Sequence, residues 1–148
     1  MPMCRKISLL ACLLCLSLAI FAQERPKFDP ARFEAELEQF ITVEAGFTPQ
    51  DASKFFPLYR EMRTKQRYYF DQMRKYDYVD FENDKQCAEA IEQKDKLDLA
   101  IKELQQQYHA KFMRVLPPKK VYKAIRAEDK FHKRAFHRIA KRGKKQAK

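Results

Sequence analysis

Residues 48–78 read TPQDASKFFPLYREMRTKQRYYFDQMRKYDY, and this stretch decides the fold. About 30 helical residues at 1.5 Å each make a rod of roughly 45 Å, which is long for a domain of this size. A rod of that length cannot surround a compact core, so its partners must lie along it. One stripe of the rod is marked by residues that recur at alternating spacings of four and three: Phe55, Tyr59, Met62, Gln66, Tyr69, Met73 and Tyr76.

The start of this helix and a proline inside it are both marked in the sequence. Thr48 precedes Pro49, an N-cap acceptor followed by proline at the first helical position. Pro57 removes a backbone donor and crowds the carbonyl of Ser53, so we expect a kink there. The alternative is that residues 49–55 form a separate short helix.

An earlier helix is predicted between two boundary signals. Asp29-Pro30 is the start signal, and Gly46 stands at the left-handed position that ends a helix. The short break before Thr48 requires a sharp turn, so this helix should fold back on the next. Its apolar stripe is Phe33, Leu37, Phe40 and Ile41.

A third helix is predicted from Asn83 to about Val115, matching the second in length. Asn83 with Gln86 three residues later reads as a capping box. Two long helices joined by a short break should form an antiparallel hairpin. The apolar stripe of the third helix is Ala90, Leu97, Ile101, Leu104, Tyr108, Phe112 and Val115.

A last helix should start after Leu116-Pro117-Pro118 and end near Gly143. The sequence therefore predicts an all-α fold with four helices in an elongated antiparallel hairpin arrangement and a kinked long second helix. The expected inner face of the last helix is Val121, Ile125, Glu128, His132, Ala135, Phe136 and Ile139.

The first 22 residues have the order of a secretory signal. Arg5 and Lys6 precede an apolar run at residues 7–21, and small Ala22 precedes polar residues. An uncleaved anchor is the alternative, although the run is short for a membrane span. We expect a cleaved signal peptide at residues 1–22, and thus a periplasmic protein with no stable membrane insertion after cleavage.

The remainder reads as a single helical domain at residues 23–142 and a basic disordered tail at residues 143–148. Cys87 is the one cysteine beyond the signal, so an intrachain disulfide is excluded. The lone thiol is expected either to be buried or to form an intermolecular bridge.

The positive charge is concentrated near the C-terminus. From Pro117 to Lys148 there are 13 Lys or Arg and 2 acids, whereas Gln23–Leu116 has 16 and 18. Export argues against nucleic acid as the partner, so acidic surfaces or unfolded proteins are the expected targets. The candidate partner-binding residues form one side of the last helix: Lys119, Lys123, Arg126, Lys130, Lys133 and Arg134, with Lys141 further along.

Enzymatic constellations are nearly absent, and neither an enzyme nor a cofactor is indicated. A lower-ranked alternative is a metal site, because His109 and Met113 lie four apart on one helical face and His132 follows Glu128 by four. Such a His/Met set suits copper or nickel. The simpler interpretation is that His109 and Met113 flank the core while Glu128 meets His132 or an arginine across the bundle.

FTPQD (residues 47–51), LPPKK (116–120) and AEDKFHKRAFHRIAKR (127–142) together resemble the Spy/CpxP group of periplasmic helical proteins. That group carries LTxxQ motifs where an early helix and the last helix open. Here Phe47 and Thr48 match the first motif with Gln50 one place early, and Leu116 alone matches the second. The third stretch resembles the group's charged C-terminal helix.

The resemblance implies an antiparallel helical hairpin pair, a possible homodimer, and either chaperone activity without ATP or regulation of envelope-stress sensors. We therefore expect a chaperone-like module that binds unfolded or envelope proteins. The alternatives are a periplasmic metal-binding sensor of the heavy-metal-resistance type and an adaptor that docks on an envelope-stress regulator.

Overall fold

The computed structural model describes residues 28–146, with the backbone alone for Arg142 and residues 144–146. The predicted signal peptide at residues 1–22 therefore lies outside the described residues. The chain divides into two units, residues 1–33 and 34–148.

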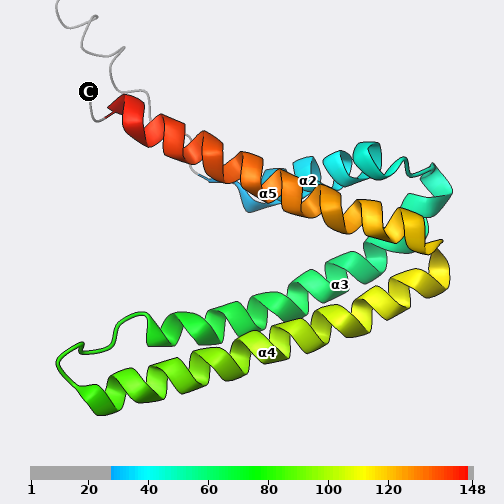
Figure 1. The fold of residues 1–148 in the computed structure, drawn as a ribbon. Helices are drawn as coiled ribbons and strands as arrows, with labels where there is room; N and C mark the ends of the chain where they lie inside the picture. Colours follow the sequence, from blue (N-terminus) through cyan, green and yellow to red (C-terminus); the bar gives the residue numbers. More distant parts are fainter. Residues whose placement is uncertain (1–27, 147–148) are drawn as a thin grey trace, which may run out of the picture. The chain divides into compact units, whose positions relative to one another are not determined.

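The elements are α2 (Pro30–Ala45), α3 (Pro49–Met73), the 3-10 helix η1 (Arg74–Tyr76), α4 (Asp84–Val115) and α5 (Pro118–Gln146). No strand occurs among residues 28–146, so the all-α prediction is confirmed (Figure 1).

The predicted start and end of α2 are confirmed. Asp29 caps α2 by accepting from the backbone N–H groups of Ala31 and Arg32, at 3.0 and 3.2 Å. Gly46 ends it with φ of +65°, a backbone conformation that glycine adopts without a steric penalty. Leu37 and Ile41 from the predicted stripe are fully buried.

The chain enters α3 through a capping box that the sequence indicated only in part. The Thr48 hydroxyl accepts from the backbone N–H of Asp51 at 3.1 Å, as predicted. In return, the Asp51 carboxylate accepts from the backbone N–H of Thr48 at 2.8 Å. α3 then passes through Pro57 as one helix, so a separate helix at residues 49–55 is wrong. The long helix ends at Met73, and only η1 continues it.

α3 and α4 form the predicted antiparallel hairpin. The Phe55 and Phe112 ring centroids are 4.5 Å apart, and Lys94 Nζ lies 2.7 Å from Asp77 Oδ1. Contacting positions thus rise from α3 into the turn after η1 as they fall along α4, which is the antiparallel arrangement (Figure 1). The Asn83 side chain caps α4 by accepting a hydrogen bond from the backbone N–H of Gln86 at 3.1 Å. The Gln86 side chain accepts from Asp80 rather than from Asn83, so the reciprocal half of the predicted capping box is wrong.

α2 and α5 pack beside the first half of α3. The Arg60 guanidinium on α3 bonds both oxygens of Glu38 on α2, at 2.7 and 2.6 Å. The Phe40 ring on α2 lies 5.6 Å from Phe131 on α5, and Tyr59 on α3 bonds Glu128 on α5. The three helices bury most of the apolar core together with the C-terminal end of α4: Leu37, Ile41, Phe47, Phe55, Phe56, Tyr59, Phe112, Leu116, Val121, Ala124, Ala127 and Phe131.

The predicted inner face of α5 is wrong in its second half. Phe136 and Ile139 are 70% and 69% exposed, whereas Phe131 is 4% exposed. The buried line instead follows Val121, Ala124, Ala127 and Phe131, which recur at spacings of three and four along one side of α5. The predicted end at Gly143 is also wrong: α5 continues to Gln146, so the residues assigned to a disordered tail include helical ones.

Candidate protein-binding surface

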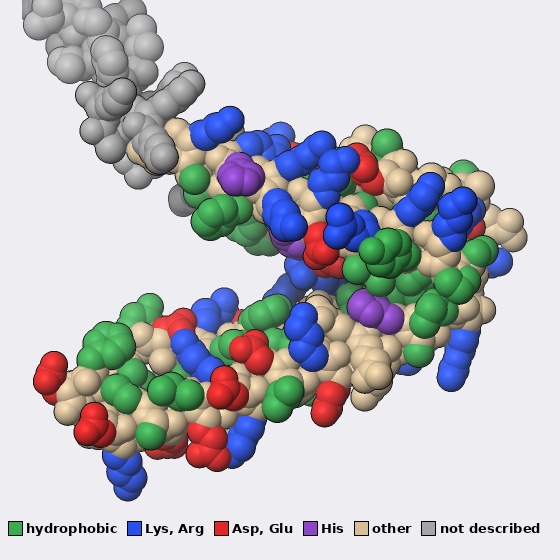
Figure 2. Space-filling view, viewed as in Figure 1, with side chains coloured by type: hydrophobic (Ala, Val, Ile, Leu, Met, Phe, Trp, Pro, Cys, Tyr) green, Lys and Arg blue, Asp and Glu red, His purple; other side chains and the backbone are tan. Residues whose placement is uncertain are grey.

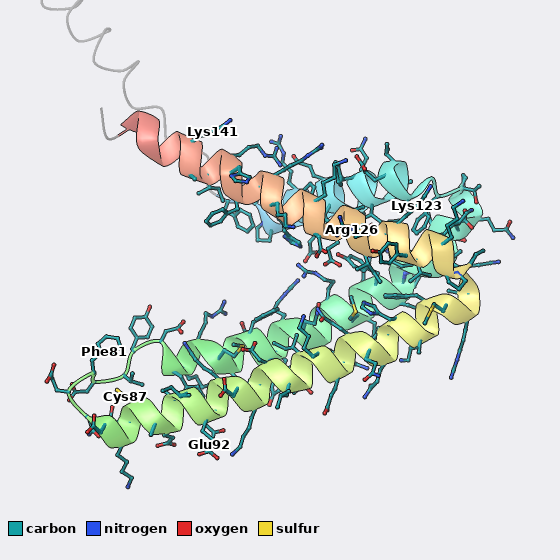
Figure 3. The ribbon with its side chains drawn as sticks, in the orientation of Figure 1. Phe81, Cys87, Glu92, Lys123, Arg126 and Lys141 are labelled. Carbon is teal, nitrogen blue, oxygen red and sulfur yellow. The ribbon has the colours of Figure 1, made fainter. Side chains whose placement is uncertain are left out.

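The basic residues proposed as a partner-binding face all project from α5 into solvent. The exposed set is Lys119, Lys123, Arg126, Lys130, Lys133, Arg134 and Lys141. Figure 2 shows Lys and Arg side chains gathered over α5, and Figure 3 labels three members of the set there. One member is neutralised locally, since Lys130 Nζ lies 2.8 Å from both carboxylate oxygens of Glu44 on α2. We name the exposed set the basic face.

A groove of about 660 Å³ runs between α2 and the later part of α5. Phe40, Val43 and Phe131 supply its apolar surface, and Arg134 lies with its guanidinium carbon 5.1 Å from the centre of the Phe40 ring. We call it the α2–α5 groove. Its polar lining is mostly basic, with the acid Glu36 on α2: Glu36, Gln39, Arg134, His137, Arg138 and Lys141.

A second hollow, of about 460 Å³, lies on the basic face itself. Its lining includes Tyr122 and several basic residues, with Glu44 and Asp129 as the acids. Arg134 and His137 line both this hollow and the α2–α5 groove. α5 therefore carries two adjoining depressions in which positive charge stands next to exposed apolar or aromatic surface.

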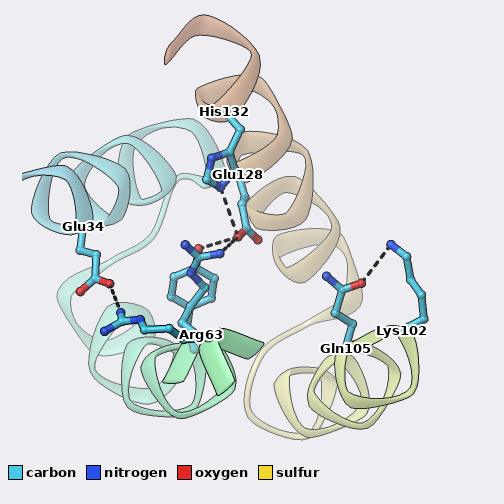
Figure 4. Close-up of polar contacts among 8 residues, drawn as sticks. Glu34, Arg63, Lys102, Gln105, Glu128 and His132 are labelled. Carbon is cyan, nitrogen blue, oxygen red and sulfur yellow. Dashed lines mark hydrogen bonds and ion pairs between the residues drawn. The ribbon is translucent and has the colours of Figure 1, made fainter. Parts of the chain in front are cut away.

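Glu128 joins α5 to α3 through a polar cluster that includes the buried Tyr59. The Tyr59 hydroxyl donates to Glu128 Oε1 at 2.8 Å. Arg63 Nη1 and His132 Nε2 each lie 3.7 Å from the same oxygen, and Figure 4 shows both side chains directed at it. Glu128 thus meets a histidine and an arginine, as the simpler interpretation of this position predicted.

The cluster shifts the acidity of its members. Burial acts to raise the pKa of Glu128, but His132, the Tyr59 hydroxyl and the Arg63 charge outweigh it and lower that pKa below the usual value. Burial and the nearby Glu128 charge raise the pKa of Tyr59. The carboxylate is therefore ionised and the phenol neutral near pH 7, which is the state that forms the hydrogen bond.

The candidate metal ligands occupy different environments. His109 is half-buried beside Phe112, and burial lowers its pKa. Met113 is 49% exposed on α4, and His132 belongs to the Glu128 cluster. Among residues 28–146 no three or more His, Cys, Asp or Glu side chains are grouped so that they could hold a metal ion.

The helix-start motif residues have structural positions at one end of the core. Phe47 packs against Phe55 with ring centroids 5.1 Å apart, Thr48 caps α3, and Leu116 is buried at the C-cap of α4. The structure brings the two motif segments together, because Lys120 forms an ion pair with Asp51. The bonds from Lys120 and from the Thr48 backbone lower the pKa of Asp51 to about 2.

Three features of this region were not predicted from the sequence: the Tyr59–Glu128 bond, the Lys120–Asp51 pair and the burial of Phe131. The two pairs each join positions 69 residues apart, so no helical periodicity points to them. Phe131 could have been found from Ala124 and Ala127, since small residues at spacings of three and four mark a closely packed helix face.

Comparison with known proteins identifies no relative: no protein-family model, no curated protein and no solved structure matches the chain. None of the helices within residues 28–146 combines the length and hydropathy that a bilayer span requires.

Proposed function

We propose that this chain is a periplasmic protein-binding module that holds unfolded or misfolded proteins without ATP or a cofactor. The observation that carries the proposal is the pairing, on α5, of an exposed basic face with exposed apolar side chains. Phe136 and Ile139 are exposed on the same helix that supplies the seven exposed cations of the basic face. Exposed apolar surface rimmed by charge is typical of sites that bind other proteins.

The two kinds of surface suit successive steps of capture. Positive charge attracts acidic segments over distances up to the Debye length, about 10 Å at 0.1 M salt. Apolar contact with the α2–α5 groove and with Phe136 then slows release. Unfolded proteins expose both acidic and apolar side chains, so they satisfy both steps, whereas a folded acidic protein satisfies only the first.

The periplasmic assignment is an inference from residues 1–22, whose order is that of a cleavable secretory signal. The resemblance of residues 47–51, 116–120 and 127–142 to Spy/CpxP proteins supports the same class of activity.

The experiment measures aggregation of an unrelated unfolding protein with and without this chain. We expect suppression that weakens as salt rises from tens to hundreds of millimolar. Lys119, Lys123, Arg126 and Lys133 are the residues to replace together by glutamine, since none of them forms an ion pair with another described residue. Lys130 is left intact because it binds Glu44.

A matched control removes the same charge elsewhere: Lys54, Lys85, Lys102 and Arg114, all exposed on α3 or α4, are replaced by glutamine. The basic-face variant should capture clients several-fold more slowly, and the control variant at the parent rate. Equal rates for both variants would show that the basic face has no part in capture. Failure of the parent to suppress aggregation would instead favour the adaptor alternative.

A further inference from the structure

The turn between α3 and α4, with the start of α4, has a charge opposite to that of α5. Residues 77–99 contain eight acids and three lysines. Two of the lysines are paired within the segment, Lys94 with Asp77 and Lys96 with Glu92. Glu82 and Glu89 form no ion pair with any described residue. Figure 2 shows acidic side chains gathered at this end of the α3–α4 hairpin.

The same segment exposes large apolar side chains. Tyr78 is 93% exposed and Phe81 is 80% exposed, and Ile91 and Leu99 are exposed on α4. Figure 3 shows Phe81 in the turn, close to the start of α4. We call residues 77–99 the hairpin tip. The tip thus presents aromatic side chains surrounded by negative charge.

The α2–α5 groove offers the complementary combination. Its floor is apolar, through Phe40, Val43 and Phe131, and its α5 rim carries Arg134, Arg138 and Lys141. A partner for this groove needs an apolar side chain to enter it and acids on either side. Aromatic residues are the usual anchors of such contacts, and each buries about 150–250 Å².

We propose that the hairpin tip of one copy of this chain docks into the α2–α5 groove of a second copy. Phe81 enters the apolar floor, and Glu82 and Glu89 face the cations of the rim. The two surfaces are different parts of the chain, so the contact is heterologous and each docked copy still offers a free tip and a free groove. Self-association should therefore continue past the dimer as the protein concentration rises. The proposal does not depend on client binding.

The test is sedimentation velocity of the whole protein, under reducing conditions to prevent bridging through Cys87, across roughly two decades of protein concentration. We expect the weight-average sedimentation coefficient to rise with concentration at low salt, with the apparent affinity falling about tenfold or more at several hundred millimolar salt. Replacement of the anchor, Phe81→Ala, should abolish the rise. Tyr68→Ala is its control, because Tyr68 is exposed outside the tip.

Charge reversal identifies the two surfaces. One variant carries Arg134→Glu with Arg138→Glu in the groove, and the other Glu82→Lys with Glu89→Lys in the tip. In each variant alone, the reversed side chains face rim or tip groups of the same sign, so each variant should remain monomeric. An equimolar mixture should regain association, because each tip then meets a groove of opposite charge. Lys54→Glu and Glu103→Lys, at exposed positions on α3 and α4, should associate like the parent.

Several results would overturn the proposal. These are a monomer at every concentration, a closed dimer that does not grow, or mixed variants that stay monomeric while their melting temperatures match the parent. A difference in sedimentation coefficient between the parent and a variant that is the same at every protein concentration would show that tip and groove meet within one molecule. Misfolding of a single variant does not mimic the expected pattern, because a misfolded chain would not recover on mixing.

Discussion

The Tyr59 hydroxyl on α3 donates a 2.8 Å hydrogen bond to Glu128 Oε1 on α5, joining two residues that are 69 positions apart. Both side chains are largely buried, so this bond orients α5 on the core. A buried carboxylate that loses a donor retains its desolvation cost without compensation.

Tyr59→Phe should therefore lower the free energy of unfolding by about 1.5–3 kcal/mol, the range for hydrogen bonds to charged groups. The measurement is urea denaturation followed by circular dichroism. Tyr122→Phe is the control, since Tyr122 is 65% exposed, and it should unfold with the parent. If both variants unfold at the parent midpoint, Arg63 and His132 satisfy Glu128 without the phenol.

Two phenylalanines on α5 should respond very differently to truncation. Phe131→Ala empties a core position next to Phe40 and should cost about 3–5 kcal/mol. Phe136→Ala removes an exposed ring and should change stability by less than about 0.5 kcal/mol. Similar losses for both would mean that the later part of α5 is covered in solution, which contradicts its exposure in the structure.

The two glycines should respond in opposite directions to alanine. Gly46 has φ of +65°, and the position that an added Cβ would occupy is open. Gly46→Ala should therefore cost about 1–2 kcal/mol through backbone strain alone. Gly143 lies within α5 with equally open surroundings, and Gly143→Ala should stabilise that helix by about 0.5–1 kcal/mol. Thermal melts of the two variants, compared with the parent, provide the check.

The capping box of α3 makes Thr48 sensitive to substitution. Thr48→Ala leaves the Asp51 N–H without its acceptor and should lower stability by roughly 1 kcal/mol. Ser53→Ala is a matched control in the same helical turn, because the Ser53 hydroxyl bonds only the exposed Gln50 carbonyl. A Thr48→Ala melting temperature equal to that of Ser53→Ala would remove the cap as a source of stability.

Asp51 should make stability depend on acid pH. Its pKa of about 2 in the folded protein lies below the ordinary 3.8, so the ionised carboxylate favours the fold above pH 3.8. That contribution is lost as the pH falls through the folded value. Asp51→Asn should therefore be less stable than the parent at pH 6, and the difference should shrink toward pH 2. A difference that is constant across this range would place the pKa of Asp51 at its ordinary value.

The starts of the helices and the end of α2 were predictable because the signals that set them are local. Asp29 and Thr48 each accept from backbone N–H groups two or three residues ahead, and Gly46 supplies the positive φ that ends α2. Residues this close in sequence meet in any chain that starts a helix there, so the pattern alone is sufficient. The long α3 and α4 stripes also follow from periodicity, and an antiparallel hairpin is their simplest pairing.

Tertiary structure decided which face of α5 is buried and what its charges meet. Periodicity placed Phe136 and Ile139 inside, yet α2 covers Phe131 and leaves those two residues in solvent. A helical stripe predicts which residues share a face, but the packing of the neighbouring helix decides which face is covered. α2 lines the α2–α5 groove with Arg134, His137, Arg138 and Lys141 of α5, and Phe136 and Ile139 stay exposed outside that lining. The same holds for Glu128 and Lys120, whose partners Tyr59 and Asp51 approach only because α5 packs along the first half of α3.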